Sequence, residues 1–123
     1  MAMAGAPTPR PDHVAAVADM AFGMQEVLGR FNENHDPPFR IRIGLHSGAI
    51  AAGIIGKHRF LYDIWGDTVN TASRIESYSE PGRIHVSAEV AAVLAADFDL
   101  ESRGVMEIRG KGEIETFFLN RRK

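Results

Sequence analysis

The sequence has 123 residues, of which 45% are hydrophobic and 24% charged, and 14 Lys and Arg stand against 16 Asp and Glu. This length and balance are typical of one small folded domain and exclude a disordered tail, a collagen-like repeat and a coiled coil. The formal net charge of −2 gives no general electrostatic reason to bind nucleic acid or an anionic membrane. The absence of cysteine excludes a disulfide framework, a thiol nucleophile and a cysteine zinc site.

No segment has the pattern of a membrane span or a signal peptide. The purest apolar run, residues 49–55, is far shorter than the roughly 20 residues that cross a bilayer. Residues 1–11 have neither a basic start nor a long apolar core, so we expect no secretory leader there.

A long helix is predicted after a proline-rich start. Pro7, Pro9 and Pro11 favour a loop, and Asp12 is a typical helix N-cap residue. Apolar residues then recur at helical spacing, which predicts an amphipathic helix to about Asn34, ended by two prolines. These apolar residues are Val14, Val17, Ala18, Ala21, Met24, Leu28 and Phe31.

Three strands are predicted next. Ile41, Ile43 and Leu45 alternate with polar or small residues over 40–46, the period of a half-buried strand. Residues 49–65 read as a hairpin whose turn lies at 56–59. On its return strand alternation puts Asp63 on one face with Leu61 and Trp65, and the opposite face carries Phe60, Tyr62 and Ile64.

The second half alternates helices and strands. Gly66 and Asp67 open a helix to about Tyr78, with an expected inward stripe of Val69, Ala72 and either Ile75 or Glu76. A short strand at 83–86 follows a turn, and the next helix is expected to be capped by Ser87 and to face inward through Val90, Val93 and Leu94. Two last strands, roughly 98–108 and 114–119, are separated by Gly110-Lys111-Gly112. Together these elements predict one domain of mixed α and β structure.

Residues 62–74 carry the most informative pattern. Asp63 lies on a strand that a glycine turn joins to a helix, and on that helix Asn70 and Arg74 are four residues apart and share a face. A carboxylate accepts a hydrogen bond from an exocyclic amine, a guanidinium holds phosphate oxygens, and an amide orients a ribose or ring oxygen. Together these groups suggest a nucleotide. The alternative from the residues alone is a structural turn aspartate beside a solvated helix face.

The segment 62–74, YDIWGDTVNTASR, resembles the signature of class III nucleotidyl cyclases, specifically the adenylyl cyclase catalytic domain. Residues 41–48 and 52–56 are similar to the family's strand and glycine turn, and 110–112 to its closing loop. The resemblance covers essentially all of residues 1–120, in order. It implies an α+β fold, an α/β sandwich of the ferredoxin-like cyclase type. We expect a mainly antiparallel sheet with flanking helices, and residues 1–123 as a single partial domain truncated at its N-terminus.

The resemblance also implies roles for individual residues. The family's adenine-reading aspartate matches Asp63, and a carboxylate suits the amino group of adenine but repels the O6 acceptor of guanine. Its ribose-positioning asparagine matches Asn70, and Arg74 matches the arginine that offsets charge on the phosphate as the 3′-hydroxyl attacks. A triphosphate-contacting lysine corresponds to Arg109, with Lys111 two residues further on. The implied reaction converts ATP to 3′,5′-cyclic AMP and pyrophosphate in cyclic-nucleotide signalling. The resemblance also implies that this reaction takes place in the cytoplasm, whether or not the whole protein also spans a membrane.

The metal ligands of the family are expected to be missing from this chain. Complete domains begin with a strand carrying a metal-binding aspartate, followed by a second aspartate and an adenine-specifying lysine, and residues 1–5 resemble the strand after that lysine. Mg²⁺ or Mn²⁺ is expected for the complete family site. Asp12, Asp19 and Asp36 do not have the spacing of a ligand set, and we interpret His46 and His85 as structural.

Because the family site forms between two chains, this chain is expected to supply the adenine-recognition and transition-state half in a homodimer or a heterodimer with another cyclase domain. It could equally be a remnant, or a piece whose missing part was removed. A second hypothesis is a catalytically inactive interaction or regulatory module on the cyclase scaffold. Since the missing strand is central in the family's sheet, we also expect exposed edges that favour self-association.

Overall fold

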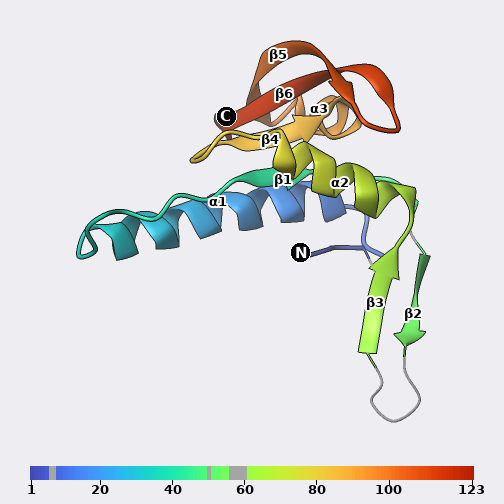
Figure 1. Ribbon diagram of the computed structural model, residues 1–123, viewed down its shortest axis with the longest axis horizontal. Helices are drawn as coiled ribbons and strands as arrows, with labels where there is room; N and C mark the ends of the chain where they lie inside the picture. Colours follow the sequence, from blue (N-terminus) through green and yellow to red (C-terminus); the bar gives the residue numbers. More distant parts are fainter. Residues whose placement is uncertain (6–7, 50, 56–60) are drawn as a thin grey trace.

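The computed structural model describes residues 1–5, 8–49, 51–55 and 61–123, with the backbone alone for 51–55 and 61–65. These residues form a four-stranded sheet in the order β1-β4-β6-β5, a separate two-stranded hairpin of β2 and β3, and three helices (Figure 1). In chain order the elements are α1 (His13–Asn32), β1 (Ile43–Leu45), β2 (Ala51–Ile55), β3 (Leu61–Trp65), α2 (Asp67–Ser77), β4 (Ile84–Ser87), α3 (Ala88–Leu94), β5 (Phe98–Ile108) and β6 (Gly112–Arg122).

The four-stranded sheet is mainly antiparallel. β1 runs parallel to β4, whereas β4 pairs with β6 and β6 with β5 in antiparallel register. His85 in β4 lies opposite Gly44 on one side and Phe118 on the other. This arrangement confirms the predicted α+β class with its flanking helices.

Helices cover both faces of the sheet. All four residues of β4 are buried, so neither face is open at the sheet's centre. On one face α1 and α3 pack against alternate strand residues, and the buried cluster there comprises Val14, Ala18, Ala21, Ile43, Leu45, Ile84, Val86, Val90, Ala91, Leu94, Phe98 and Leu119. The opposite face carries α2, where the His85 ring bonds the carbonyl of the fully buried Ile75. The helix that carries Asn70 and Arg74 is thereby fixed to the sheet.

Most predicted elements are confirmed, with shifted boundaries. The first helix ends at Asn32, two residues earlier than expected, and β6 extends to Arg122. The strand expected over 40–46 is limited to 43–45, because only these residues pair with β4. The backbone of β2 and β3 forms the predicted antiparallel hairpin, and its turn at 56–59 lies outside the described residues.

Several finer expectations were wrong. The inward side of α2 consists of Thr71 and Ile75, whereas Val69 and Ala72 are half-buried. On α3, Ala91 is buried in place of Val93, which is 60% exposed because it lies on the face turned away from the sheet.

At the chain's start, one expectation is confirmed in position and another is wrong. Asp12 stands at the N-cap position of α1, but its side chain caps no backbone N–H, since Arg10 binds it in a fork. Residues 1–5, expected to resemble a strand, form none.

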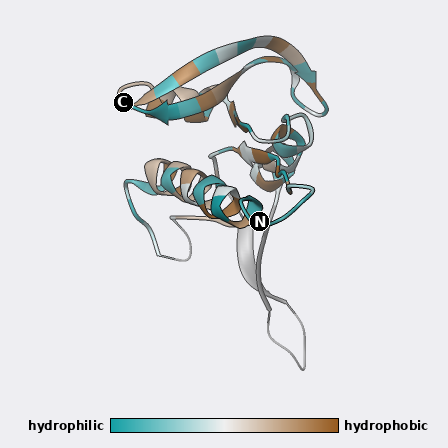
Figure 2. Cartoon of the chain, turned by 90° about the vertical axis from the view of Figure 1, so that its left-hand side faces the viewer, coloured by the Kyte–Doolittle hydropathy of each residue, from teal (hydrophilic) through white to brown (hydrophobic). Residues whose placement is uncertain are grey.

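The hairpin extends away from the four-stranded sheet in both views of the molecule (Figures 1 and 2). β3 leads directly into α2 through Gly66, whose φ of 119° lies in the region that favours glycine. None of the described helices combines the length and the apolar character needed to cross a membrane.

Candidate active site

One face of α2 gathers the polar residues of the signature segment. Asp67, Asn70 and Arg74 are spaced i, i+3 and i+7, so they lie along the same side of the helix. Asp67 occupies the first turn, where a negative charge interacts favourably with the helix dipole. Thr71 and Ile75 face the sheet, which leaves the polar side for a ligand.

The turn between β5 and β6 lies against this polar face. Lys111 N–H donates to the Ile108 carbonyl at 2.9 Å, and Gly110 and Gly112 have φ of 84° and 77°. The positive φ of Gly110 favours glycine, whereas a Cβ there would stand 2.7 Å from Arg74 Nη1, the end of a flexible side chain that can shift.

Two contacts join the turn to α2. Arg74 Nη1 donates to the Arg109 carbonyl at 2.6 Å, and the Lys111 ammonium forms an ion pair with Asp67. The structure therefore brings together Arg74, Arg109 and Lys111, three of the five residues that the sequence singled out. The contact to Arg109 is made through its backbone carbonyl, and the Lys111 ammonium is paired with Asp67.

The Asp67 carboxylate is held in its ionised form. The hydrogen bond from Lys111 lowers the pKa of Asp67 below its ordinary value, and the charges of Lys111 and Arg74 act in the same direction. At neutral pH Asp67 is therefore a fixed negative charge between the cations. The sequence predicts Asp67 only as the start of a helix, and no local pattern indicates its pairing with Lys111.

Asp63 lies near this cluster along the chain, and the structure describes its backbone. It pairs with Gly53 in the hairpin, two residues before β3 ends and four before α2 begins. Its side chain lies outside the described part of the structure. Asn70 is exposed and borders a large cavity.

That cavity, of about 1130 Å³, lies between α1, β1 and α2. Its wall is apolar on the α1 side, with Val17, Met20 and Met24, and polar on the α2 side, with Thr68, Asn70 and Ser73. Asn70 lines this cavity, whereas Arg74, Arg109 and Lys111 do not, so the cavity and the β5–β6 turn lie on different sides of Asn70.

His46 lies at the end of β1 and serves the fold. Its Nδ1 bonds Ser87 Oγ at 2.8 Å, and the same hydroxyl accepts from Val90 N–H at 3.4 Å, which caps α3 as predicted. Burial lowers the pKa of His46, which keeps the ring neutral at physiological pH. These contacts agree with a structural role for His46.

The described residues do not fit a resident metal ion of the kind class III cyclases use. Among the residues whose side chains the structure describes, 1–5, 8–49 and 66–123, no three His, Asp or Glu side chains converge as a ligand set. Asp12 and Asp19 are engaged by Arg10 and Arg122 respectively. No chemical step is therefore assigned to a metal held by this chain.

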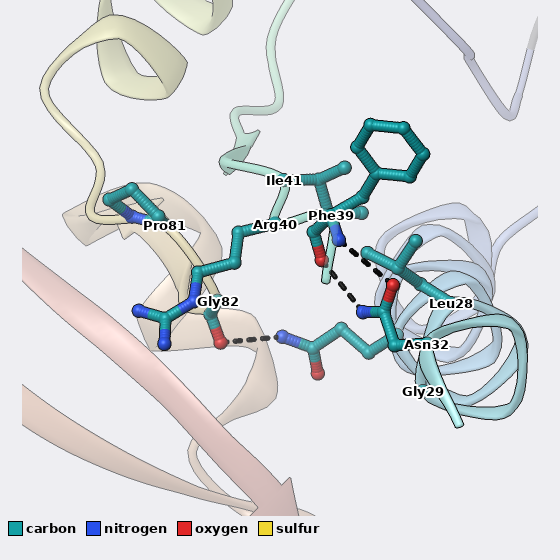
Figure 3. Close-up of a pocket in the computed structure, with 9 residues that line it drawn as sticks. Leu28, Gly29, Asn32, Phe39, Arg40, Ile41, Pro81 and Gly82 are labelled. Carbon is teal, nitrogen blue, oxygen red and sulfur yellow. Dashed lines mark hydrogen bonds between the residues drawn. The ribbon is translucent and has the colours of Figure 1, made fainter. Parts of the chain in front are cut away.

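A second pocket lies at the far end of α1 and contains none of the predicted site residues. It measures about 300 Å³ and lies between α1, the segment entering β1 and the turn before β4 (Figure 3). Asn32 exchanges two hydrogen bonds with the Phe39 backbone, and Gln25 donates to the Gly82 carbonyl (Figure 3). These hydrogen bonds hold the segment entering β1 and the turn before β4 against α1. The residues that line this pocket therefore have a structural role.

The fold is an α+β domain in which helices cover both faces of a mainly antiparallel sheet. The model of the adenylate and guanylate cyclase catalytic domain family matches residues 1–121, and the chain belongs to this family. It is 44% identical over all 123 residues to an adenylate cyclase of Mycobacterium tuberculosis, and 46% identical over 112 residues, 87% of this chain, to human retinal guanylyl cyclase 2.

Solved structures agree with this assignment. The guanylate cyclase domain of RhGC from Catenaria anguillulae, in complex with GTP, superposes with a TM-score of 0.90 at 36% identity over 97% of this chain. The catalytic core of a rhodopsin-guanylyl cyclase with converted specificity, in complex with ATPαS, gives 0.86 at 35% identity over 96% of this chain.

The chain spans only part of each relative. It covers 28% of the mycobacterial protein, 10% of the retinal cyclase, 65% of the Catenaria domain and 64% of the core with converted specificity. Relatives named for adenylate and for guanylyl cyclase activity match at similar identity, so overall similarity does not discriminate between the two substrates.

Proposed function

We propose that this chain supplies the adenine-recognition and transition-state half of an adenylyl cyclase site, as a single partial domain over residues 1–123. The reaction is attack of the ribose 3′-oxygen of ATP on the α-phosphorus. The bond to pyrophosphate breaks, and 3′,5′-cyclic AMP, pyrophosphate and a proton are released. A second cyclase domain, in a homodimer or heterodimer, supplies the Mg²⁺ or Mn²⁺ ligands that the described residues do not provide.

The observation that carries the proposal is that the turn bearing Arg109 and Lys111 is held against the side of α2 that carries Asn70 and Arg74. These residues come from a helix and from a turn more than thirty positions away in the chain. Such a cluster suits a triphosphate, because guanidinium and ammonium groups bind phosphate oxygens in charge-assisted hydrogen bonds. Arg74 uses one N–H on the Arg109 carbonyl and keeps the others for the charge that develops on the α-phosphate.

Preference for ATP rests on Asp63. A carboxylate accepts a hydrogen bond from the amino group of adenine, whereas guanine presents an acceptor at that position. The match to a mycobacterial adenylate cyclase over the whole chain supports this choice. The core with converted specificity, solved in complex with ATPαS, shows that a closely similar fold accommodates an adenine nucleotide.

A binding measurement tests the base preference. The parent chain should bind ATP more tightly than GTP, and Asp63→Cys should lower the ATP-to-GTP affinity ratio roughly 10- to 100-fold, the range for loss of a hydrogen bond to a charged group. Arg74→Ala should weaken both nucleotides and leave the ratio unchanged. Tighter binding of GTP by the parent chain would overturn the adenine assignment.

The second candidate is a catalytically inactive cyclase-like module that pairs with another domain. This alternative is favoured by the absence, among the described residues, of any group of three side chains that could bind a metal ion. ATP binding without any turnover, even beside a partner that carries the family's metal aspartates, would support this alternative.

A further inference from the structure

Two contacts hold the β5–β6 turn against α2. Asp67 holds Lys111 at the start of the helix, and Arg74, seven residues further on, holds the Arg109 carbonyl. Seven residues of α-helix span roughly 10 Å, so the two contacts fix both the position and the tilt of the turn. Asn70 lies between them on the same side of α2.

Both contacts occupy cations that a triphosphate would also engage. Lys111 is bound to a carboxylate and Arg74 to a carbonyl, and both partners offer oxygen acceptors, as phosphate does. A bound phosphate chain must therefore share or displace these oxygens. The carboxylate is the stronger competitor, because it carries a full negative charge.

The Asp67–Lys111 pair is easily exchanged. The Asp67 side chain is 69% exposed and that of Lys111 is 33% exposed, so water screens their attraction. A polyphosphate carries several negative charges and offers more oxygen acceptors than one carboxylate, which favours transfer of Lys111 to the ligand.

We propose that Asp67 is an internal competitor of the substrate's phosphate chain. It holds Lys111, and with it the turn that carries Arg109, against α2 when no nucleotide is bound, and it gives up Lys111 when the triphosphate arrives. The inference rests on the proposed function, because it takes the ligand of this turn to be a nucleoside triphosphate. Asp67 then tunes affinity for the phosphate chain and has no part in reading the base.

Inorganic tripolyphosphate is the direct probe, because it has the charge of the substrate's chain and no base. Titrated into the chain at low ionic strength by calorimetry, it should bind Asp67→Asn roughly two- to fivefold more tightly than the parent, the range expected from exposed ion pairs. Asp19→Asn is the matched control, since Asp19 is 51% exposed and pairs with Arg122. It removes the same charge away from the turn and should leave the affinity unchanged.

A double substitution separates competition from simple support of the turn. In a Lys111→Gln background Asp67 has no ammonium to hold, so the gain from Asp67→Asn should fall to about onefold. Weaker or unchanged binding by Asp67→Asn alone would overturn the inference, as would a gain that persists without Lys111.

The proposed function and this inference fail in different ways. Preference for GTP would overturn the adenine assignment but leave the tripolyphosphate result standing. If tripolyphosphate binds neither the parent nor Asp67→Asn, the inference is wrong whatever the base preference.

Discussion

His85 combines full burial with an incomplete set of hydrogen bonds. Its side chain is 0% exposed, Nδ1 lies 2.8 Å from the Ile75 carbonyl, and Nε2 has no partner among the residues that the structure describes. Because a carbonyl only accepts, the proton resides on Nδ1 of the neutral ring. Burial lowers the pKa of His85, since a buried imidazolium loses its hydration.

The folded protein should therefore lose stability in acid. The folded pKa lies below the unfolded value of about 6.5, so the unfolded state binds the proton more readily. The contribution is fully present above pH 6.5 and declines as the pH falls below that value. Urea unfolding at pH 7.5 and 5.5 should show a smaller pH-dependent loss in His85→Asn, which keeps a donor for Ile75 but cannot titrate. An equal loss in parent and variant would contradict the assignment to His85.

At the scale of elements, the contact between β1 and α2 positions the site. Gly44 lies where the strand meets the helix backbone, and a Cβ on it would stand 2.2 Å from Glu76 N and 2.5 Å from Glu76 Cα. These are backbone atoms of α2, so the clash is relieved only by moving the helix that carries Asn70 and Arg74.

Gly44→Ala should destabilise the fold by about 1–3 kcal/mol or more, the range for overpacking in a close-packed interior. Gly23→Ala is the control, because Gly23 lies in α1 and a Cβ on it would meet nothing within 4 Å, and it should stabilise by about 0.5–1 kcal/mol. Denaturant unfolding of the two variants measures the difference. Equal stability in both would mean that β1 and α2 do not pack as described.

Elements with strong local signals could be predicted from the sequence. The apolar spacing of α1, the Ser87 cap of α3 and the Gly-Lys-Gly turn each depend on residues close together in the chain. Residue burial was less predictable, because it depends on which partner each face meets. Val93 has the right spacing for the core of α3 but points away from the sheet, and Thr71 is buried despite its hydroxyl.

The candidate site could likewise be predicted only in part. The spacing of Asn70 and Arg74 predicted their shared face of α2, and the family resemblance singled out Arg109 and Lys111. Their meeting with Arg74 depends on the antiparallel return of β6 against β5, which brings the turn to α2. The Asp67–Lys111 pair is a tertiary contact between segments 44 positions apart, and no local pattern specifies it.

For the molecule as a whole, α1 presents an apolar stripe to solvent. Met20, Met24, Val27 and Phe31 follow a spacing of four, three and four residues, and their exposures are 48%, 46%, 62% and 51%. Apolar residues at this spacing are typical of a helix face that packs against another helix. β1, only three residues long, lies at one edge of the sheet beside α1.

We therefore expect the chain to self-associate at micromolar concentration through the exposed face of α1. Val27→Asp should shift sedimentation toward the 13.5 kDa monomer, because it puts a charge in the middle of the stripe. Val93→Asp is the matched control, since Val93 is a valine of similar exposure, 60%, on α3. Sedimentation of the parent as the monomer alone would contradict the expectation.

We propose above that this chain provides the nucleotide-recognition half of an adenylyl cyclase site. The most direct test of this proposal is mass-spectrometric detection of cyclic nucleotide from ATP and from GTP with Mn²⁺. The chain is assayed alone and mixed with a complete cyclase domain whose own residues matching Asn70 and Arg74 are replaced by alanine. We expect cyclic AMP in the mixture only, in excess of cyclic GMP, and its loss when Arg74→Ala is introduced in this chain. Cyclic AMP from the chain alone, no product in the mixture, or an excess of cyclic GMP would contradict it.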